Sequence, residues 1–188
     1  MELKECKECM ERSFGHGPVP GHGNPKLAKI CLLGRNPGVT EDLKGVPFVG
    51  RAGGKLNTGL VLAHILRNEC YVTNMGKCYT PTSVKPSAKC YERCKELWLC
   101  NEMRSLEKLK LIVTLGNEAL KYFEPLASVG ELHGYPFPAK RPWGKLLEES
   151  ITVFVSYHPS AALRSSIMNK HFMKDMSRLH QLWKELDA

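Results

Sequence analysis

The stretch that decides the fold is residues 29–53, KICLLGRNPGVTEDLKGVPFVGRAG, where an apolar run meets a glycine-rich loop. Residues 29–34 are short, apolar and end at a glycine, which is typical of a buried strand. The loop from residue 34 to 53 holds five glycines and two prolines, so its backbone can approach a flat ligand closely. The pattern therefore predicts a strand that leads directly into a binding loop.

Three further apolar runs resemble residues 29–34, and helical patterns separate them. The predicted strands are residues 29–34, 70–74, 110–116 and 151–158. The predicted helices are residues 54–67, 87–109, 117–123 and 169–186. Strands that alternate with helices favour an α/β fold with three αβα layers, in which helices cover a central, mostly parallel four-stranded sheet.

Four short stretches follow the carboxyl ends of these strands, where sheets of this class carry their sites. They are GRNPG (34–38), TNMGKC (73–78), LGNEA (115–119) and YHPSAALR (157–164). Two familiar phosphate-binding loops do not fit. Leu56 follows Gly54-Lys55 where a Walker loop needs Ser or Thr, and GRNPG lacks the glycine spacing of a dinucleotide fingerprint.

The composition favours a basic protein that acts inside the cell. The chain has 27 Lys and Arg against 19 Asp and Glu, and its formal charge of +8 suits a surface that meets a polyanion such as nucleic acid. It contains neither a signal-peptide core nor a run of about 18 apolar residues. We therefore expect a soluble, cytoplasmic protein, in which eight cysteines favour a metal site over disulfides.

The loop sequence GRNPGVTEDLKGVPFVGRAG closely resembles the first motif of the iron-sulfur family 4 uracil-DNA glycosylases. YVTNMGKC at 71–78 looks like the family's second strand with its uracil-reading Asn, and SYHPSAALR at 156–164 looks like its His-Pro-Ser DNA-insertion motif. The resemblance runs in the same order from Cys6 to about Arg164. It implies the uracil-DNA glycosylase fold and a monofunctional hydrolase that removes uracil from DNA and leaves an abasic site.

The resemblance assigns a base pocket to five residues. Asn74 matches the Asn that binds the uracil edge, because its amide offers a donor and an acceptor together. Phe48 matches the aromatic residue that stacks on the extruded base, and the pocket is bordered by Gly34, Arg35 and Gly38. Taken without the family pattern, Asn74 could cap a strand and Phe48 could pack in the core.

The resemblance also assigns the chemistry. His158 matches the His that reaches uracil O2, where negative charge builds as the bond breaks, and Glu41 matches the acid that holds the attacking water. Arg35 and Asn36 stand where the family has Glu and Ala. Asn36 is similar to the water-positioning Asn of the single-strand-selective and mismatch-specific branches, so the division of work between Asn36 and Glu41 stays open. Arg35 leaves hypoxanthine, xanthine or a damaged pyrimidine open as competing substrates.

The motif at 156–164 implies contacts with DNA. Leu163 is the candidate wedge that fills the stack vacated by the extruded nucleotide. Ser160 belongs to the same insertion motif, and Arg164 is expected to contact backbone phosphates.

The cysteine spacing resembles the family's four-ligand cluster. Four thiolates suit one [4Fe-4S] cluster, and the matching positions are Cys6, Cys9, Cys78 and Cys94. Zinc needs the same ligands and stays an alternative, because spacing cannot separate the two metals. Cys90 and Cys100 lie on the same predicted helix as Cys94, and either could replace it.

These inferences together describe one protein. We expect residues 1–188 to form a single uracil-DNA glycosylase-like domain whose N-terminal segment binds the cluster. The chain is expected to act as a monomer on DNA that contains uracil or another deaminated base, and not on membranes. Two alternatives remain: a glycosylase of the same superfamily with a different or broader base preference, and a non-catalytic iron-sulfur protein that binds DNA.

Overall fold

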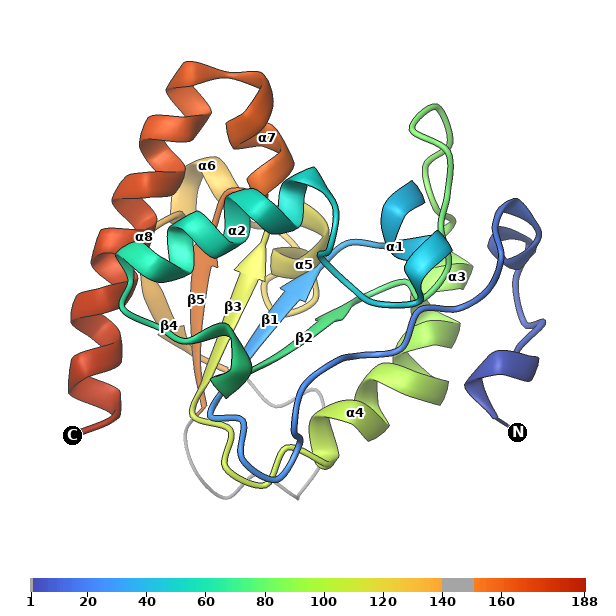
Figure 1. Cartoon of the computed structure of the whole chain (residues 1–188), viewed down its shortest axis with the longest axis horizontal. Helices are drawn as coiled ribbons and strands as arrows, with labels where there is room; N and C mark the ends of the chain where they lie inside the picture. Colours follow the sequence, from blue (N-terminus) through green and yellow to red (C-terminus); the bar gives the residue numbers. More distant parts are fainter. Residues whose placement is uncertain (1, 140–150) are drawn as a thin grey trace.

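The central sheet has five strands in the order β2-β1-β3-β5-β4 (Figure 1). This computed structural model describes residues 2–139 and 151–188. The strands are β1 (Ile30–Gly34), β2 (Cys70–Asn74), β3 (Leu111–Leu115), β4 (Pro136–Pro138) and β5 (Thr152–Ser156). The first three and β5 are parallel and coincide with the four predicted strands, whereas β4 pairs antiparallel with β5.

The predicted number of four strands was therefore wrong. Strand β4 has only three residues and a proline at each end, so its sequence PFP reads as a turn. Proline is tolerated in a sheet on an edge strand, which is where β4 lies.

The helices differ from the prediction mainly in their bounds. They are α1 (Val39–Lys44), α2 (Arg51–Leu62), α3 (Ala88–Cys94), α4 (Cys100–Arg104), α5 (Asn117–Lys121), α6 (Val129–Leu132), α7 (Pro159–Arg164) and α8 (Ser166–Leu186). Shorter turns are η1 (Leu3–Glu5), η2 (Met10–Phe14), η3 (Arg67–Glu69) and the π-helical η4 (Lys95–Leu99). The predicted helix 87–109 is thus two α-helices joined by η4, and the predicted helix 54–67 begins and ends earlier, as α2.

Helices cover both faces of the sheet, which confirms the predicted three layers (Figure 1). On one face, the sheet packs against α2 and α8 through Leu56, Leu60, Phe172 and Met176. On the other face, it packs against α4 and α5 and the chain around them through side chains such as Leu99, Met103 and Ala119. Strands β1, β2 and β3 are buried on both sides, which explains why they are continuous apolar runs.

The register of the sheet brings the ends of β1 and β2 together. Gly34, the last residue of β1, pairs with Asn74, the last residue of β2. Because the strands are parallel, the loops that follow them leave the same edge of the sheet, which is the upper edge in Figure 1. This edge is where the sequence predicts the site.

A buried ion pair fixes the chain just after β2. The Lys77 ammonium is 1% exposed and lies 2.6 Å from the Glu102 carboxylate of α4. It also donates to the Thr73 hydroxyl at 2.7 Å and to the Asn74 carbonyl at 3.0 Å. A buried charge needs such partners, so Lys77 binds the end of β2 firmly to α4.

Within the part of the chain that the structure describes, no helix combines the length and the apolar character needed to cross a bilayer.

Candidate functional site

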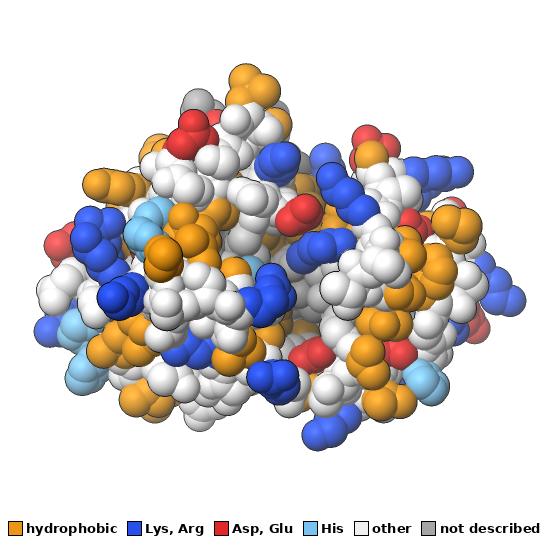
Figure 2. Space-filling model, turned by 90° about the horizontal axis from the view of Figure 1, so that it is seen from above, with side chains coloured by type: hydrophobic (Ala, Val, Ile, Leu, Met, Phe, Trp, Pro, Cys, Tyr) orange, Lys and Arg blue, Asp and Glu red, His pale blue; other side chains and the backbone are white. Residues whose placement is uncertain are grey.

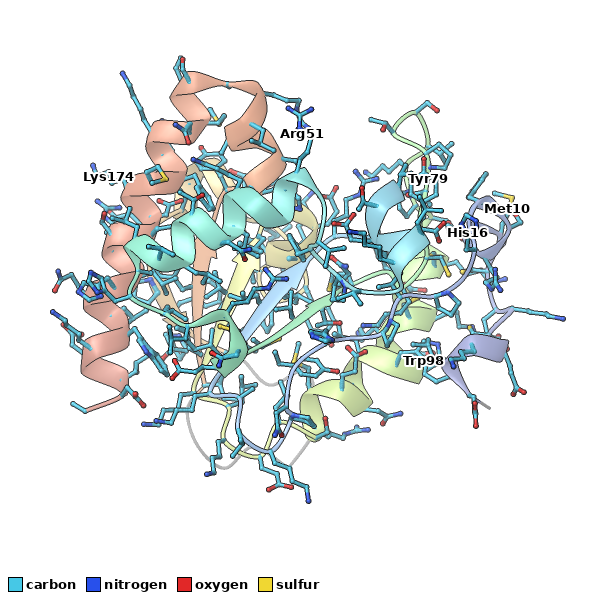
Figure 3. All side chains as sticks on the ribbon, in the orientation of Figure 1. Met10, His16, Arg51, Tyr79, Trp98 and Lys174 are labelled. Atoms are coloured by element: carbon cyan, nitrogen blue, oxygen red, sulfur yellow. The ribbon has the colours of Figure 1, made fainter. Side chains whose placement is uncertain are left out.

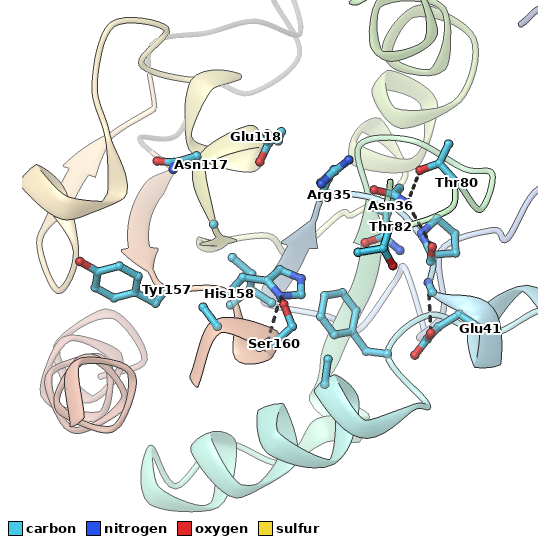
Figure 4. Close-up of a pocket in the computed structure, with 18 of the residues that line it drawn as sticks. Arg35, Asn36, Glu41, Thr80, Thr82, Asn117, Glu118, Tyr157, His158 and Ser160 are labelled. Atoms are coloured by element: carbon cyan, nitrogen blue, oxygen red, sulfur yellow. Dashed lines mark hydrogen bonds between the residues drawn. The ribbon is translucent and has the colours of Figure 1, made fainter. Parts of the chain in front are cut away.

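A cavity of about 660 Å³ opens at the carboxyl edge of the sheet. Figure 4 shows that residues from four rim segments face it: Arg35 and Asn36 after β1, Thr80 after β2, Glu118 after β3, and His158 after β5. The predicted site residues that line the cavity are Arg35, Asn36, Gly38, Glu41, Phe48, Asn74, His158, Ser160 and Arg164. The structure therefore gathers residues that the sequence separates by more than 120 positions.

Gly34 lies beneath the cavity, between Asn74 and Phe48. A Cβ atom at this position would lie 2.5 Å from Asn74 Oδ1 and 2.5 Å from the edge of the Phe48 ring. Contacts that short are repulsive, so only glycine allows the amide and the ring to approach each other here.

Asn74 has an unused acceptor. It is 3% exposed, and its Oδ1 atom has no hydrogen-bond partner among the residues that the structure describes. A buried polar atom without a partner costs roughly 1–3 kcal/mol. An unpaired Oδ1 beside a cavity is therefore the position where a ligand N–H would be favoured.

His158 has its tautomer fixed by the first turn of α7. Its Nδ1 accepts the backbone N–H of Ser160 at 3.1 Å and lies 2.7 Å from the Ser160 hydroxyl. A backbone N–H can only donate, so Nδ1 carries no proton and the ring proton is on Nε2. The imidazole of His158 is thus a neutral ring whose Nε2–H is available as a donor.

The charge state of His158 follows from its surroundings. Burial, followed by the positive charges of Arg164 and Arg35, lowers the pKa of His158 to about 4. Its ring lies 5.8 Å from the Phe48 ring, centroid to centroid, with an angle of 33° between the planes. The donor and the aromatic face therefore belong to one compartment of the cavity.

The amide of Asn36 is oriented by two acceptors. Its Nδ2 donates to the Pro37 carbonyl at 3.1 Å and to the Thr80 hydroxyl at 3.0 Å (Figure 4). Because a carbonyl can only accept, the atom beside Pro37 O must be the amide nitrogen. Asn36 Oδ1 is consequently an oriented acceptor on the cavity side of the loop.

Glu41 also lines the cavity, but its carboxylate binds its own loop. The carboxylate accepts backbone N–H groups from Gly38 at 3.1 Å, Val49 at 2.9 Å and Gly50 at 2.7 Å. Three such bonds hold both ends of the segment 38–50 to one 8% exposed side chain. Glu41 therefore shapes the loop on which Phe48 lies.

Arg35 extends from the end of β1 between Asn36 and Glu118 (Figure 4). Its Nε donates to the Tyr91 hydroxyl of α3 at 3.2 Å, which fixes the orientation of the Arg35 side chain. Its positive charge reaches His158, where it contributes to the lowered pKa.

The mouth of the cavity is basic. Figure 2, which looks onto this edge of the sheet, shows a central hollow bordered by several Lys and Arg side chains. Arg164 lines the cavity from α7, and the neighbouring Leu163 is 42% exposed. An exposed leucine next to a basic cavity has the chemistry of a wedge beside a phosphate contact.

The N-terminal segment lies beside α1 and the chain that follows β2. Figure 3 shows Met10 and His16 of this segment on the same side of the molecule as Tyr79. The carboxylate of Asp42 accepts the His16 backbone N–H at 3.0 Å and lies 2.8 Å from its Nδ1. Asp42 therefore supports the site by holding the N-terminal segment in place.

Five cysteines gather between this segment and α3. The Sγ atoms of Cys9 and Cys90 are 3.7 Å apart. A hydrogen bond from Cys90 lowers the pKa of Cys94 to about 7. Burial, and then the charges of neighbouring cysteines that include Cys6, raise the pKa of Cys78 to about 12. Among the described residues, only Cys9, Cys90 and Glu11 place their possible ligand atoms within 4.8 Å of one another, whereas Cys6, Cys78 and Cys94 lie near enough to other cysteines of this group to influence their pKa values.

The Glu11 carboxylate, which lies beside the cysteines, indicates whether this group could bind a cation. It is 2% exposed, and its Oε1 accepts the backbone N–H and the hydroxyl of Ser87, both at 2.7 Å. Its Oε2 has no partner among the described residues, although its carboxylate lies within 4.8 Å of Cys9 and Cys90 sulfur. A buried carboxylate oxygen without a partner, next to cysteine sulfurs that can lose their protons to a metal ion, is a donor set that fits a metal. Cys100 lies elsewhere, 3.9 Å from the Tyr122 hydroxyl.

Sequence reasoning missed three residues that orient the site. Thr80 fixes Asn36, Tyr91 fixes Arg35, and Glu11 adds a carboxylate to the thiols. The C-x2-C spacing points to Cys6 and Cys9 but not to Glu11, and Thr80 and Tyr91 carry no motif of their own. Their contacts arise only from the packing of the N-terminal segment, the loop after β2 and α3.

Comparison with known proteins agrees with this geometry. A family model described as the uracil DNA glycosylase superfamily matches residues 20–186. The chain is 33% identical over 188 residues to a type-4 uracil-DNA glycosylase of Sulfurisphaera tokodaii, a match that covers 96% of this chain and 81% of that one. It is 31% identical to proteins of the same name from Archaeoglobus fulgidus, with 96% and 89% covered, and from Thermotoga maritima, with 87% and 80% covered.

The protonation of His158 gives a first prediction. Because its pKa of about 4 lies below the ordinary 6.5, the unfolded chain binds a proton between these values that the folded chain does not. The contribution of His158 to stability is therefore complete above pH 6.5 and is lost as the pH falls towards 4. Nitrogen-15 NMR of the ring should show a neutral Nε2–H tautomer down to about pH 5. A midpoint near 6.5 would contradict the assignment.

Proposed function

The chain belongs to the uracil-DNA glycosylase superfamily, and on that premise we propose that it removes uracil from DNA by hydrolysing the N-glycosidic bond and leaving an abasic site. The observation that carries the proposal is the unpaired Asn74 Oδ1 beside Phe48, opposite a neutral His158. Asn74 matches the hydrogen-bonding edge of one flat base, Phe48 matches its face, and His158 matches its O2 atom. We also propose that it works inside the cell, as expected of an enzyme whose substrate is DNA.

Asn74 would read the base. Uracil offers N3–H as a donor and O4 as an acceptor, and an amide pairs with both at once. Cytosine carries an acceptor at N3 and an amino group at position 4, so it would leave Asn74 Oδ1 facing a lone pair. Burying a mismatched polar pair is costly enough for strong discrimination.

Phe48 would hold the base after it leaves the helix. The ring is 6% exposed and borders the cavity next to Asn74. Stacking on an aromatic ring offsets part of the few kcal/mol that extrusion costs. On the DNA side, Leu163 would fill the vacated stack, and Ser160 and Arg164 would contact the backbone.

His158 would stabilise the departing base. The Nε2–H donor, directed at uracil O2, interacts more strongly with the anion that forms than with the neutral base, so it lowers the barrier. A neutral ring suits this role, because it neither needs nor loses a proton near pH 7. Burial is the main cause of the lowered pKa that keeps the His158 ring neutral, and the positive charges of Arg164 and Arg35, which add to this effect, also favour the anion.

Asn36 would hold the attacking water, and Glu41 would support it. Because Asn36 Nδ2 donates both of its hydrogen bonds to the protein, Oδ1 is the atom that can accept a hydrogen bond from water. The Glu41 carboxylate is engaged by three backbone N–H groups, so its main contribution is to the loop and to the negative potential near the sugar. This division of work accounts for the presence of both residues.

The cysteine site would hold a [4Fe-4S] cluster, with Cys6, Cys9, Cys78 and Cys94 as ligands. Support comes from the cysteines that lie near one another and from the Oε2 atom of Glu11, which has no partner among the described residues, and zinc remains the rival metal. Such a centre would fasten the N-terminal segment to α3 and to the chain after β2, and it takes no part in the hydrolytic steps.

A broader base preference is the second candidate. The cavity of about 660 Å³ is larger than a pyrimidine requires, and Arg35 presents a donor inside it. A guanidinium pairs with carbonyl and ring-nitrogen acceptors, which hypoxanthine and xanthine offer.

The proposed function predicts release of uracil from DNA. The metal-loaded protein, incubated with duplexes that contain uracil, hypoxanthine, xanthine or a thymine mismatch, should yield alkali-labile strands with the uracil duplex and none with an undamaged control. Cleavage of the hypoxanthine or xanthine duplex at a comparable rate would favour the second candidate. If every duplex bound but stayed intact, the chain would be a DNA-binding protein without this activity.

Separate variants test the roles of Asn36 and Glu41. Asn36→Ala should slow single-turnover release by roughly 10- to 1000-fold at unchanged thermal stability, because it removes one positioned group. Glu41→Gln should lower both the rate and the melting temperature, because it replaces an acceptor of three N–H bonds by a group that also donates. Asn101→Ala, at an exposed position of α4, serves as the matched control. A wild-type rate in Asn36→Ala would refute the water assignment.

The metal assignment predicts colour. Anaerobically purified protein should be brown with a broad visible absorbance, which zinc cannot give. Serine variants of Cys6, Cys9, Cys78 or Cys94 should each lose most of this absorbance and the bound iron, whereas Cys90→Ser and the control Cys100→Ser should keep both. Colourless protein that contains one equivalent of zinc would show that the cysteine site holds zinc and not an iron-sulfur cluster. If Cys90→Ser lost its iron and one of the four proposed ligand variants kept it, Cys90 would be a ligand in place of that cysteine.

A further inference from the structure

Phe48 has a backbone conformation that a bulky residue rarely adopts. Its φ is +53°, in the left-handed region where non-glycine residues are uncommon. Such a conformation costs on the order of 1–3 kcal/mol and persists only where neighbouring groups impose it. The ring is nevertheless 6% exposed and borders the cavity. Some part of the structure must therefore hold this backbone in place.

Arg67 holds it from outside the cavity. It lies in η3, at the start of β2, whereas the cavity lies at the end of that strand. Its Nη2 donates to the Pro47 carbonyl at 3.2 Å and to the Phe48 carbonyl at 3.1 Å, and its Nη1 donates to Asn57 Oδ1 at 2.8 Å. The planar guanidinium thus links two consecutive carbonyls of the loop to α2.

The loop also approaches α2 through Gly53. A Cβ at Gly53 would collide with the Phe48 carbonyl oxygen, so glycine allows that carbonyl to turn inward towards the helix. Because the Phe48 carbonyl oxygen is turned towards the helix, it needs a hydrogen-bond donor from the protein in place of water. Arg67 supplies that donor, and a lysine, with one ammonium instead of a rigid fork, would not reproduce it.

We propose that Arg67 is a positioning residue for base binding, which acts by holding Phe48 in its left-handed conformation. The inference rests on the proposed function, because it takes Phe48 as the surface on which the extruded base stacks. Without the guanidinium, the peptide after Pro47 relaxes, and the ring leaves its place beside Asn74 and His158. Rate and affinity for the damaged strand then fall although no cavity-lining side chain has changed.

A double-mutant cycle between Arg67 and Phe48 tests this link. Arg67→Met keeps the aliphatic stem and removes the donors, and it should lower kcat/KM for the uracil duplex by about 10-fold, as expected for a misplaced reaction partner. In the Phe48→Ala background, the same change should cost less than about 2-fold, because the ring that it positions is absent. Arg67→Lys should lie between wild type and Arg67→Met. Asn101→Ala, at an exposed position of α4 that bonds neither Arg67 nor Phe48, is the control and should behave as wild type.

Two outcomes would overturn the inference. An equal loss in both backgrounds would mean that Arg67 acts on stability or on DNA and not through Phe48. An unchanged Phe48 φ and ring position in a crystal structure of Arg67→Met, or of Arg67→Lys if the first does not fold, would exclude the positioning role directly. This structural result does not depend on activity. A wild-type protein that releases no uracil would refute the proposed function, and the position of Phe48 in the variant would still decide the inference.

Discussion

The arrangement of the cavity depends on the absence of a side chain at Gly34. The parallel register pairs Gly34 with Asn74, so the last residues of β1 and β2 lie side by side. The ring of Phe48 enters the same space, and a methyl group at Gly34 would lie 2.5 Å from both the ring and Asn74 Oδ1. One missing Cβ atom therefore allows an amide edge and an aromatic face to converge on one flat ligand.

Much of the surrounding structure holds these two groups in place. The buried Lys77 ammonium pairs with the partly buried Glu102 carboxylate and donates to the carbonyl of Asn74, although burying a charge is costly. Glu41 and Arg67 bind the loop of Phe48 from its two sides, through its N–H groups and its carbonyls respectively. Cys78, one residue beyond Lys77, belongs to the cysteine group, so the chain after β2 borders both the cavity and that group. Rigid support of this kind is what a site needs when catalysis depends on positioning.

The sequence predicted the parallel core well because buried parallel strands are continuous apolar runs between turn residues. Strand β4 was missed because its proline-rich sequence resembles a turn, and the helix predicted at 87–109 hides a π-helical turn at 95–99 that shifts its register. In the site, the family resemblance singled out motif positions such as Asn74 and His158, and the structure places both of them at the cavity, whereas their roles stay predictions. The orienting partners Thr80, Tyr91 and Arg67 could not, since each contributes a common donor or acceptor whose use depends on tertiary contacts. The left-handed backbone conformation of Phe48 could not be predicted from the sequence, because bulky residues such as phenylalanine rarely adopt a positive φ.

The most direct test of this account is the side-chain amide resonance of Asn74 in nitrogen-15-labelled protein titrated with free uracil. Uracil should move this resonance saturably and free cytosine should not, since only uracil offers N3–H to Asn74 Oδ1. In Gly34→Ala the shift should disappear while the remaining spectrum stays that of a folded protein. An Asn74 resonance that ignores uracil, or one that responds equally to cytosine, would contradict the central claim that a flat base binds between Asn74 and Phe48.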